Sequence, residues 1–256
     1  MCPVQDVGCL DATRVKLECC ADDYIHANYV GTPNSSKRFI CTQAPLEKTC
    51  KDFWMMCIQD RVEYIVMLCN IIEKGAKKCY QYFPANPGSL CFGDITIECI
   101  GSTMMRFTSA TNAQVRISTL VVEQGGRKIR TRHIHWIDWP DRGVPPADTA
   151  IIQVLEVIKS TQSPIVVHCS AGVGRTGSMV LIQYILESIC LSEPIEDCNK
   201  ILLRIRSQRA NTIQTDQQYL FVHQVLLNYF VENQLLDKRW KPFLNRFTAE
   251  YNKSVF

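Results

Sequence analysis

The chain has 256 residues, of which 46% are hydrophobic and 21% are charged, and its formal net charge is +3. This length suits one large domain with a sizeable core, and the ordinary composition excludes a disordered or low-complexity protein. The charge is too small to indicate a nucleic-acid-binding protein.

The cysteines and the apolar runs indicate the cellular compartment of the protein. The chain contains 14 cysteines but no secretory signal and no Cys-x-x-Cys pair. We therefore expect free thiols in a reducing cytosol, and neither a disulfide scaffold nor a zinc site. No apolar run approaches the ~18 residues of a membrane helix. These features predict a cytoplasmic protein, or the intracellular part of a longer one, without a membrane span.

Strands dominate the predicted structure of the first half of the chain. Apolar residues at helical spacing in 49–59 predict one buried helix, and the apolar run 64–68 predicts a central strand. Residues 89–137 alternate as antiparallel strands do, with Gly-Gly at 125–126 as a hairpin turn. The basic run 127–132 is typical of a solvated strand face.

Helices dominate the second half. Residues 148–160 form an amphipathic pattern, residues 194–206 predict a helix with Pro near its start, and a further helix begins near residue 214. The order of strands, loops and helices predicts an α/β (α+β) fold, with a central twisted mixed sheet and helices on both faces. We expect residues 1–256 to form a single domain.

The C-terminal tail, residues 238–256, is also predicted to be helical. One apolar stripe at helical spacing comprises Trp240, Phe243, Leu244, Phe247 and Tyr251. By the usual bias of such residues toward burial, we expect this stripe to dock onto the domain.

The stretch from Val166 to Gly177 carries the clearest chemistry. It reads Val-Val-His-Cys-Ser-Ala-Gly-Val-Gly-Arg-Thr-Gly, a strand, a Gly-containing loop and the start of a helix. Such a loop forms an anion cradle, because its backbone N–H groups and the helix N-terminus point inward. Cys169, with His168 beside it, should have a pKa of roughly 3.5–7.5, and Arg175 can grip two phosphate oxygens. The loop offers a nucleophile and an oxyanion clamp for phosphoryl transfer.

The spacing Cys-x5-Arg alone is weak evidence, since a second match joins Cys198 to Arg204. That match has no Gly and lies in a helical pattern, so it predicts no cradle. The alternative for Cys169 is a small buried hydrophobe, which is the usual fate of a free cysteine.

The ten residues from His168 to Gly177 resemble the signature loop of the tyrosine-specific protein phosphatases, and the resemblance runs from about Asp6 to about Tyr229. It implies a cysteine phosphatase fold and a protein-tyrosine phosphatase that acts on phosphotyrosine in proteins. It implies no metal and no cofactor, since Arg and backbone amides supply the positive charge. We expect a monomer.

The resemblance assigns the roles around the thiolate of Cys169. The thiolate attacks phosphorus, while the side chain of Arg175 and the loop N–H groups hold the equatorial oxygens. Thr176 donates to the sulfur and makes it a better leaving group. The N–H groups are those of Ser170, Ala171, Gly172, Val173, Gly174 and Arg175.

Trp139-Pro140-Asp141, followed by Gly-Val-Pro, resembles the acid loop of the family. Asp141 would protonate the leaving oxygen and later activate water. From the residues alone, an ordinary turn residue is the favoured interpretation of Asp141, and Asp138 is a rival carboxylate; the resemblance favours Asp141 as the acid.

Further roles rest on the resemblance alone. Glu73 would orient Arg175, and Lys78 would contact the acid loop. Gln214 and Gln218 would position the hydrolytic water. Without the resemblance, the charged run around Glu73 reads as a solvated loop and the glutamines read as surface residues.

The chain departs from the family near its start. Asp6 would hold the substrate backbone or act as a turn carboxylate. The recognition Tyr before it is replaced by Val4, and a family Gly is replaced by Ala44. These departures keep two alternatives open: a phosphotyrosine-binding pseudophosphatase, and a dual-specificity phosphatase. A thiol enzyme of sulfur transfer would have no use for the acid loop.

Overall fold

The strands of this chain form one large sheet and one small sheet. The computed structural model describes residues 7–18, 22–141, 143–191 and 197–255. Its strands are β1 (Arg14–Lys16), β2 (Tyr24–Thr32), β3 (Ser35–Thr42), β4 (Tyr64–Met67), β5 (Ile72–Glu73), β6 (Ala76–Lys77), β7 (Gly88–Phe92), β8 (Ile95–Met104), β9 (Val115–Gln124), β10 (Arg127–Trp136) and β11 (Ile165–His168). Its helices are α1 (Cys50–Gln59), α2 (Ala150–Ile158), α3 (Gly174–Cys190), α4 (Cys198–Arg206), α5 (Asp216–Glu232) and α6 (Lys241–Val255), with 3-10 turns at Glu47–Thr49 and Lys238–Trp240.

The large sheet is mixed, with its parallel strands at the centre. In the described part of the chain its order is β1-β2-β3-β11-β4-β10-β9-β8-β7, and β3, β11, β4 and β10 run parallel. Every residue of β4 and β11 is buried, as their continuous apolar runs predict. His168 pairs in register with Thr42 and Met67, so the loops after three parallel strands meet at one edge.

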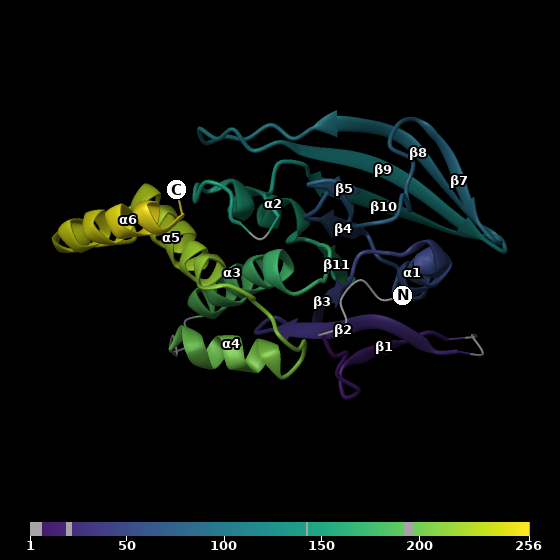
Figure 1. Cartoon of the computed structure of the whole chain (residues 1–256), viewed down its shortest axis with the longest axis horizontal. Coiled ribbons are helices and arrows are strands. Elements are labelled where there is room, and N and C mark those ends of the chain that lie inside the picture. Colours follow the sequence, from purple (N-terminus) through teal and green to yellow (C-terminus); the bar gives the residue numbers. More distant parts are fainter. Residues whose placement is uncertain (1–6, 19–21, 142, 192–196, 256) are drawn as a thin grey trace.

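Helices cover both faces of the sheet, as predicted. The connection from β3 through α1 to β4 moves along the sheet in one direction, and the connection from β10 through α2 to β11 moves back (Figure 1). Because such crossovers are right-handed, opposite directions place α1 and α2 on opposite faces. The α/β fold expected from the sequence is confirmed.

Two local predictions can be checked in detail. The turn between β9 and β10 has φ values of 54° at Gly125 and 80° at Gly126, as a tight hairpin turn requires. Cys198, the first residue of the second Cys-x5-Arg match, begins α4 after its N-cap Asp197. That match is therefore helical and forms no cradle. The predicted helix start at Pro194 lies outside the described residues.

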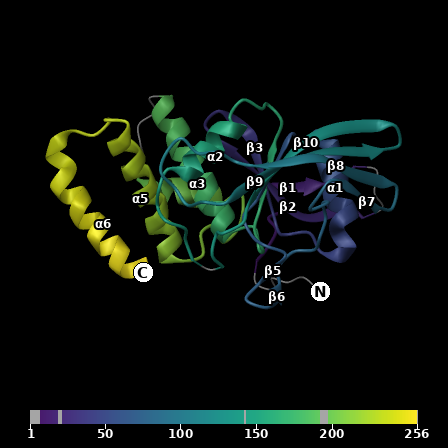
Figure 2. The same ribbon diagram turned by 90° about the horizontal axis from the view of Figure 1, so that it is seen from above.

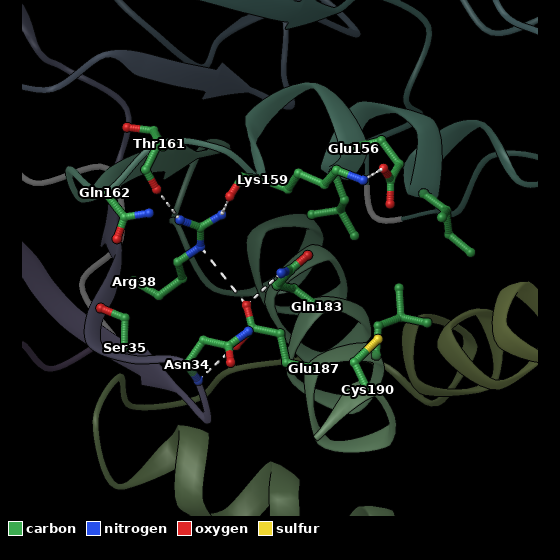
Figure 3. A pocket seen from close by; sticks show the side chains of 13 residues that line it. Asn34, Ser35, Arg38, Glu156, Lys159, Thr161, Gln162, Gln183, Glu187 and Cys190 are labelled. Carbon is green, nitrogen blue, oxygen red and sulfur yellow. Dashed lines mark hydrogen bonds and ion pairs between the residues drawn. The ribbon is translucent and has the colours of Figure 1, made fainter. Parts of the chain in front are cut away.

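A buried polar network ties α2 and α3 to the same strand. Arg38 of β3 donates to the carbonyl oxygens of Thr161 (2.7 Å) and Lys159 (3.2 Å) just after the end of α2 (Figure 3). Glu187 of α3 lies 3.9 Å from Arg38 Nε and accepts from the backbone N–H of Asn34 at 3.0 Å. These residues line a cavity of about 430 Å³. The network matters for the site because α2 follows the acid loop and α3 follows the signature loop.

The C-terminal tail is helical, as predicted, but its apolar stripe is only partly covered. Helix α6 lies along α5 at one end of the molecule (Figure 2). Tyr251 is buried, whereas Trp240 is 48% exposed and Phe243 is 66% exposed. The predicted docking is therefore confirmed at Tyr251, whereas Trp240 and Phe243, near the turn between the helices, stay largely exposed.

Candidate active site

The signature loop connects β11 to α3, leaves no room for a Cβ at Gly172 and packs closely against side chains at Gly174. Gly172 has a φ of 70°, and a Cβ there would lie 2.0 Å from the carbonyl oxygen of Thr42. A Cβ at Gly174 would lie 2.7 Å from both Gln214 Oε1 and Gln218 Nε2. The loop therefore lies against β3 on one side and against the two glutamines on the other.

The thiol of Cys169 is buried inside this loop. The backbone N–H of Gly172 donates to Cys169 Sγ at 3.2 Å. Burial raises the pKa of the Cys169 thiol, but Arg175, the hydroxyl and N–H of Thr176 and the N–H of Gly172 together lower that pKa below its usual value. Among the described residues, the buried Thr176 hydroxyl makes no geometric hydrogen bond, and Cys169 is the group whose pKa it lowers.

Arg175 is fixed by a two-point ion pair. Its Nη1 and Nη2 donate to the two carboxylate oxygens of Glu73 at 2.6 and 2.7 Å. Nη1 also donates to the carbonyl oxygens of Leu68 (2.7 Å) and Trp139 (3.3 Å). Burial acts to lower the pKa of Arg175, but the hydrogen bonds to Glu73 and the nearby Cys169 raise it overall. The guanidinium is permanently charged and held in one orientation.

Asp141 lies between two cations. Its Oδ1 accepts from Arg175 Nη2 at 3.2 Å, and its Oδ2 lies 2.9 Å from Lys78 Nζ. The loop is anchored by Trp139, which is buried with its ring packed edge-on against Trp136 and Phe221. Pro140 follows on the surface, and its carbonyl accepts from the N–H of Gly143. The structure thus brings together Asp141, Lys78 and Arg175.

The rival carboxylate lies elsewhere. Asp138 Oδ1 accepts from the backbone N–H of Gln114 at 2.9 Å, just before the start of β9. In the part of the chain that the structure describes, Asp138 contacts neither Arg175 nor Lys78, whereas Asp141 contacts both. Geometry therefore favours Asp141 as the acid.

The two glutamines reach the loop from the start of α5. Thr215 caps α5 by accepting from the N–H of Gln218, and Gln218 Oε1 accepts from the N–H of Gln214 at 2.9 Å. Ile213 donates to the carbonyl oxygen of Val173 at 3.0 Å and has a φ of 63°. This unusual backbone for a β-branched residue turns the chain so that the next residue, Gln214, faces the loop.

Arg209, which no sequence pattern indicated, lies behind the loop. Its Nη2 donates to the carbonyl oxygen of Ala171 at 3.0 Å, and its Nε donates to that of Gly172 at 3.2 Å. Nη1 donates to Asn28 Oδ1 at 2.9 Å. Because the C=O and N–H of one peptide point in opposite directions, these bonds turn the following N–H groups into the cradle. No sequence signal marks Arg209, since an Arg after a helix usually faces solvent.

A second missed group is Tyr82, which joins two buried histidines. Its hydroxyl lies 2.7 Å from Nε2 of both His168 and His133, and His168 Nδ1 lies 3.1 Å from the carbonyl oxygen of Cys169. Burial lowers the pKa of His168 to about 4 and that of His133 well below its usual value. Both rings are therefore neutral at pH 7, and a neutral His168 that donates through Nδ1 accepts from Tyr82 through Nε2.

Three expectations from the sequence remain: the roles of Asp6 and Val4, the strain at Ala44, and the absence of a metal site. Asp6 and Val4 lie outside the described ranges, so their roles stay predictions. Ala44 is buried, donates to the carbonyl oxygen of Ser170 at 3.0 Å, and has no positive φ, so replacing Gly there brings no strain. No three His, Cys, Asp or Glu side chains cluster as metal ligands in the described ranges.

Comparisons with known proteins agree with this geometry. The model of the family "Protein-tyrosine phosphatase" matches residues 2–228. Human receptor-type tyrosine-protein phosphatase zeta is 35% identical over 92% of this chain and 11% of its own length. Human tyrosine-protein phosphatase non-receptor type 9 is 34% identical over 88% of this chain and 40% of its own length. The chain thus spans less than half the length of these relatives.

Solved structures of a tyrosine phosphatase are also similar to this chain. PTPN18 in complex with HER2-pY1196 phosphor-peptides aligns with a TM-score of 0.79 and 30% identity, over 88% of this chain and 80% of that one. A second PTPN18 structure aligns with a TM-score of 0.81 and 29% identity, over 89% and 82%. The chain belongs to the protein-tyrosine phosphatase family. None of the helices formed by the described residues is long and apolar enough to cross a membrane.

Proposed function

We propose that this chain hydrolyses phosphotyrosine in proteins through a phosphocysteine on Cys169. The observation that carries the proposal is a buried thiol with a lowered pKa, held 3.2 Å from a loop N–H and next to a fixed, charged Arg175. Thiolate, anion cradle and guanidinium are the groups that phosphoryl transfer to sulfur requires. The relatives named above as tyrosine-protein phosphatases support the same substrate class.

The first step transfers the phosphoryl group to the enzyme. The thiolate of Cys169 forms an S–P bond while the P–O bond to tyrosine breaks. Arg175 and the loop N–H groups hold the three equatorial oxygens, where charge collects. Asp141, beside Arg175 at 3.2 Å, gives its proton to the phenolate.

The second step releases phosphate. Gln214, next to Gly174 of the loop, orients a water, and Asp141 takes its proton as the water attacks phosphorus. The S–P bond breaks, and the hydroxyl of Thr176 stabilises the departing thiolate. The step regenerates the thiolate of Cys169 and releases inorganic phosphate, without any redox change.

The setting of the reaction is also proposed. We infer a reducing, cytoplasmic compartment, because every cysteine in the described ranges is a free thiol. We also propose that the chain is a single domain and a monomer. Phosphotyrosine-containing proteins are the partners. A binding-only pseudophosphatase is not favoured, because Cys169, Arg175, Asp141 and Gln214 all lie in or against one loop.

The test compares a phosphotyrosine peptide with a phosphoserine peptide of the same sequence. Wild type should release phosphate from the first and not the second, and Cys169→Ser should release none. Asp141→Asn should lower kcat by about 10²-fold or more, as removal of a general acid does. Binding of the phosphotyrosine peptide by wild type without release of phosphate would refute hydrolysis and support a binding module.

A further inference from the structure

The turn between α5 and α6 carries an exposed apolar surface. We call it the hairpin-tip surface and define it by Val231, Leu235, Trp240 and Phe243, which are 51%, 61%, 48% and 66% exposed. The rings of Trp240 and Phe243 lie 5.8 Å apart. Exposed apolar residues that gather on one protruding turn indicate a site of interaction more strongly than isolated ones do.

Positive charge prevails around this turn, because residues 231–246 contain four basic and two acidic residues. The segment 238–246 reads Lys-Arg-Trp-Lys-Pro-Phe-Leu-Asn-Arg, and no Asp or Glu follows until Glu250. Arg239 lies over the Trp240 ring at 5.9 Å and 3.7 Å from Asp237. Lys241 and Arg246 are exposed, and neither has an ion-pair partner among the described residues.

This combination fits an anionic lipid surface. Trp and Phe rings partition into the boundary between headgroups and acyl chains, and Lys and Arg beside them meet anionic headgroups. The turn projects at one end of the molecule (Figures 1 and 2), where it can approach a membrane surface. We propose that the hairpin-tip surface attaches this chain peripherally to membranes that contain anionic lipid.

The fold keeps this surface away from the catalytic loop. Helix α5 starts next to Gln214, which contacts the signature loop, and ends 17 residues later at the turn. At 1.5 Å per residue the helix separates the two by about 25 Å. Attachment through the tip therefore leaves the loop open to substrate, and changes at the tip should not alter turnover of a soluble peptide.

The chain contains its own reporter of binding. Trp54, Trp136 and Trp139 are at most 2% exposed, so Trp240 is the one readily quenched from solution. The intact chain is mixed with vesicles of phosphatidylcholine, alone or with phosphatidylserine added. Vesicles with phosphatidylserine should sediment with the protein, shift its emission to the blue and protect it from acrylamide. These effects should weaken at high salt.

Two double variants separate the apolar and the charged contributions. Trp240→Ala/Phe243→Ala should lose binding, and Lys241→Gln/Arg246→Gln should weaken it by about 30-fold, a factor of about five for each cation. Matched controls are Ile100→Ala/Leu203→Ala, which remove exposed apolar side chains elsewhere, and Lys48→Gln/Arg61→Gln. Both controls should bind like wild type, and all four variants should hydrolyse a soluble phosphopeptide at the wild-type rate.

Three results would overturn the proposal. The first is no binding to vesicles with phosphatidylserine, and the second is equal binding to both kinds of vesicle. The third is a dimer in solution that Trp240→Ala/Phe243→Ala abolishes while vesicle binding stays absent, which would assign the surface to a second copy of the chain.

Discussion

Cys169 is subject to opposing effects. Burial disfavours its thiolate, while the guanidinium of Arg175 and hydrogen-bond donors of Thr176 and Gly172 favour it, and the donors prevail. The reactive form of the thiol is thus stabilised by groups on its own loop and on the first turn of α3. Single side chains can therefore be tested for their share of the effect.

Thr176→Ala should raise the pKa of the Cys169 thiol by about one unit, because a hydrogen bond to a charged group contributes about 1.5 kcal/mol. Thr176→Ser keeps the hydroxyl and is the matched control. The measurement is the rate of alkylation of the Cys169 peptide by iodoacetamide as a function of pH, read by mass spectrometry. If Thr176→Ala and wild type were alkylated with the same midpoint pH, the Thr176 hydroxyl would not stabilise the Cys169 thiolate.

His168 should make the fold sensitive to mild acid. Its pKa is about 4 in the folded chain and 6.5 as an ordinary value, and desolvation is the main cause. Between pH 6.5 and about 4 the unfolded chain binds a proton that the folded chain does not, so the free energy of unfolding falls as pH falls. The full loss is on the order of 3 kcal/mol.

His168→Gln removes this titration, so the variant should lose less stability than wild type between pH 6.5 and 4.5. Urea unfolding at several pH values measures the difference. Parallel curves for wild type and His168→Gln would mean that His168 is protonated in the folded chain.

At the scale of elements, the signature loop depends on one backbone position. Gly172→Ala should abolish turnover and destabilise the fold, because the new Cβ would lie 2.0 Å from the carbonyl oxygen of Thr42. Gly126→Ala is the control: its φ is 80° and nothing lies within 4 Å of a Cβ there, so it should cost only about 1 kcal/mol of backbone strain. Thermal unfolding and phosphopeptide turnover measure both. Similar losses of stability and turnover in the two variants would show that backbone strain alone, and not the clash with Thr42, causes the effect.

The same scale shows what the sequence could predict. The strand before Cys169, the glycine loop and the helix after Arg175 were predictable, because local periodicity and turn chemistry determine them. The pairing of Glu73 with Arg175 rested on a resemblance, since these residues are far apart in the chain. Arg209 and Tyr82 could not be found, because an Arg after a helix and a Tyr in a loop between strands look ordinary until the topology buries them.

At the scale of the whole molecule, the site depends on strand order. Glu73 follows β4, Asp141 follows β10, Cys169 follows β11 and Gln214 precedes α5, and the parallel centre of the sheet gathers these segments at one edge. Periodicity gives the strands but not their neighbours, so this arrangement could not be predicted from the residues alone. The exposure of Trp240 and Phe243 was unpredictable for the same reason, because an apolar pattern does not show which residues of a helix contact its neighbour.

Removal of residues 238–256 tests how far α6 supports the domain. The helix buries Tyr251, and Thr248 and Ser254 bond to Gln224 and Gln217 of α5. Losing one buried aromatic and these bonds should lower Tm by roughly 4–8 °C, since about 2 kcal/mol is lost in a chain of this size. Turnover of a soluble phosphopeptide should stay within about twofold.

Trp240→Ala/Phe243→Ala is the control for this deletion, because both residues are exposed, and its Tm should stay close to that of wild type. Calorimetry measures both variants. An unchanged Tm in the deletion would show that α6 contributes nothing to the stability of the catalytic core.

The covalent intermediate tests the central claim most directly. Gln214→Ala is mixed with a phosphotyrosine peptide, quenched in acid within one turnover, digested and analysed by mass spectrometry. A phosphoryl group should be found on the Cys169 peptide, more abundant than in wild type because the hydrolytic water is no longer oriented, and absent from Cys169→Ser. Release of phosphate with no phosphoryl group on Cys169 at any time would contradict the account.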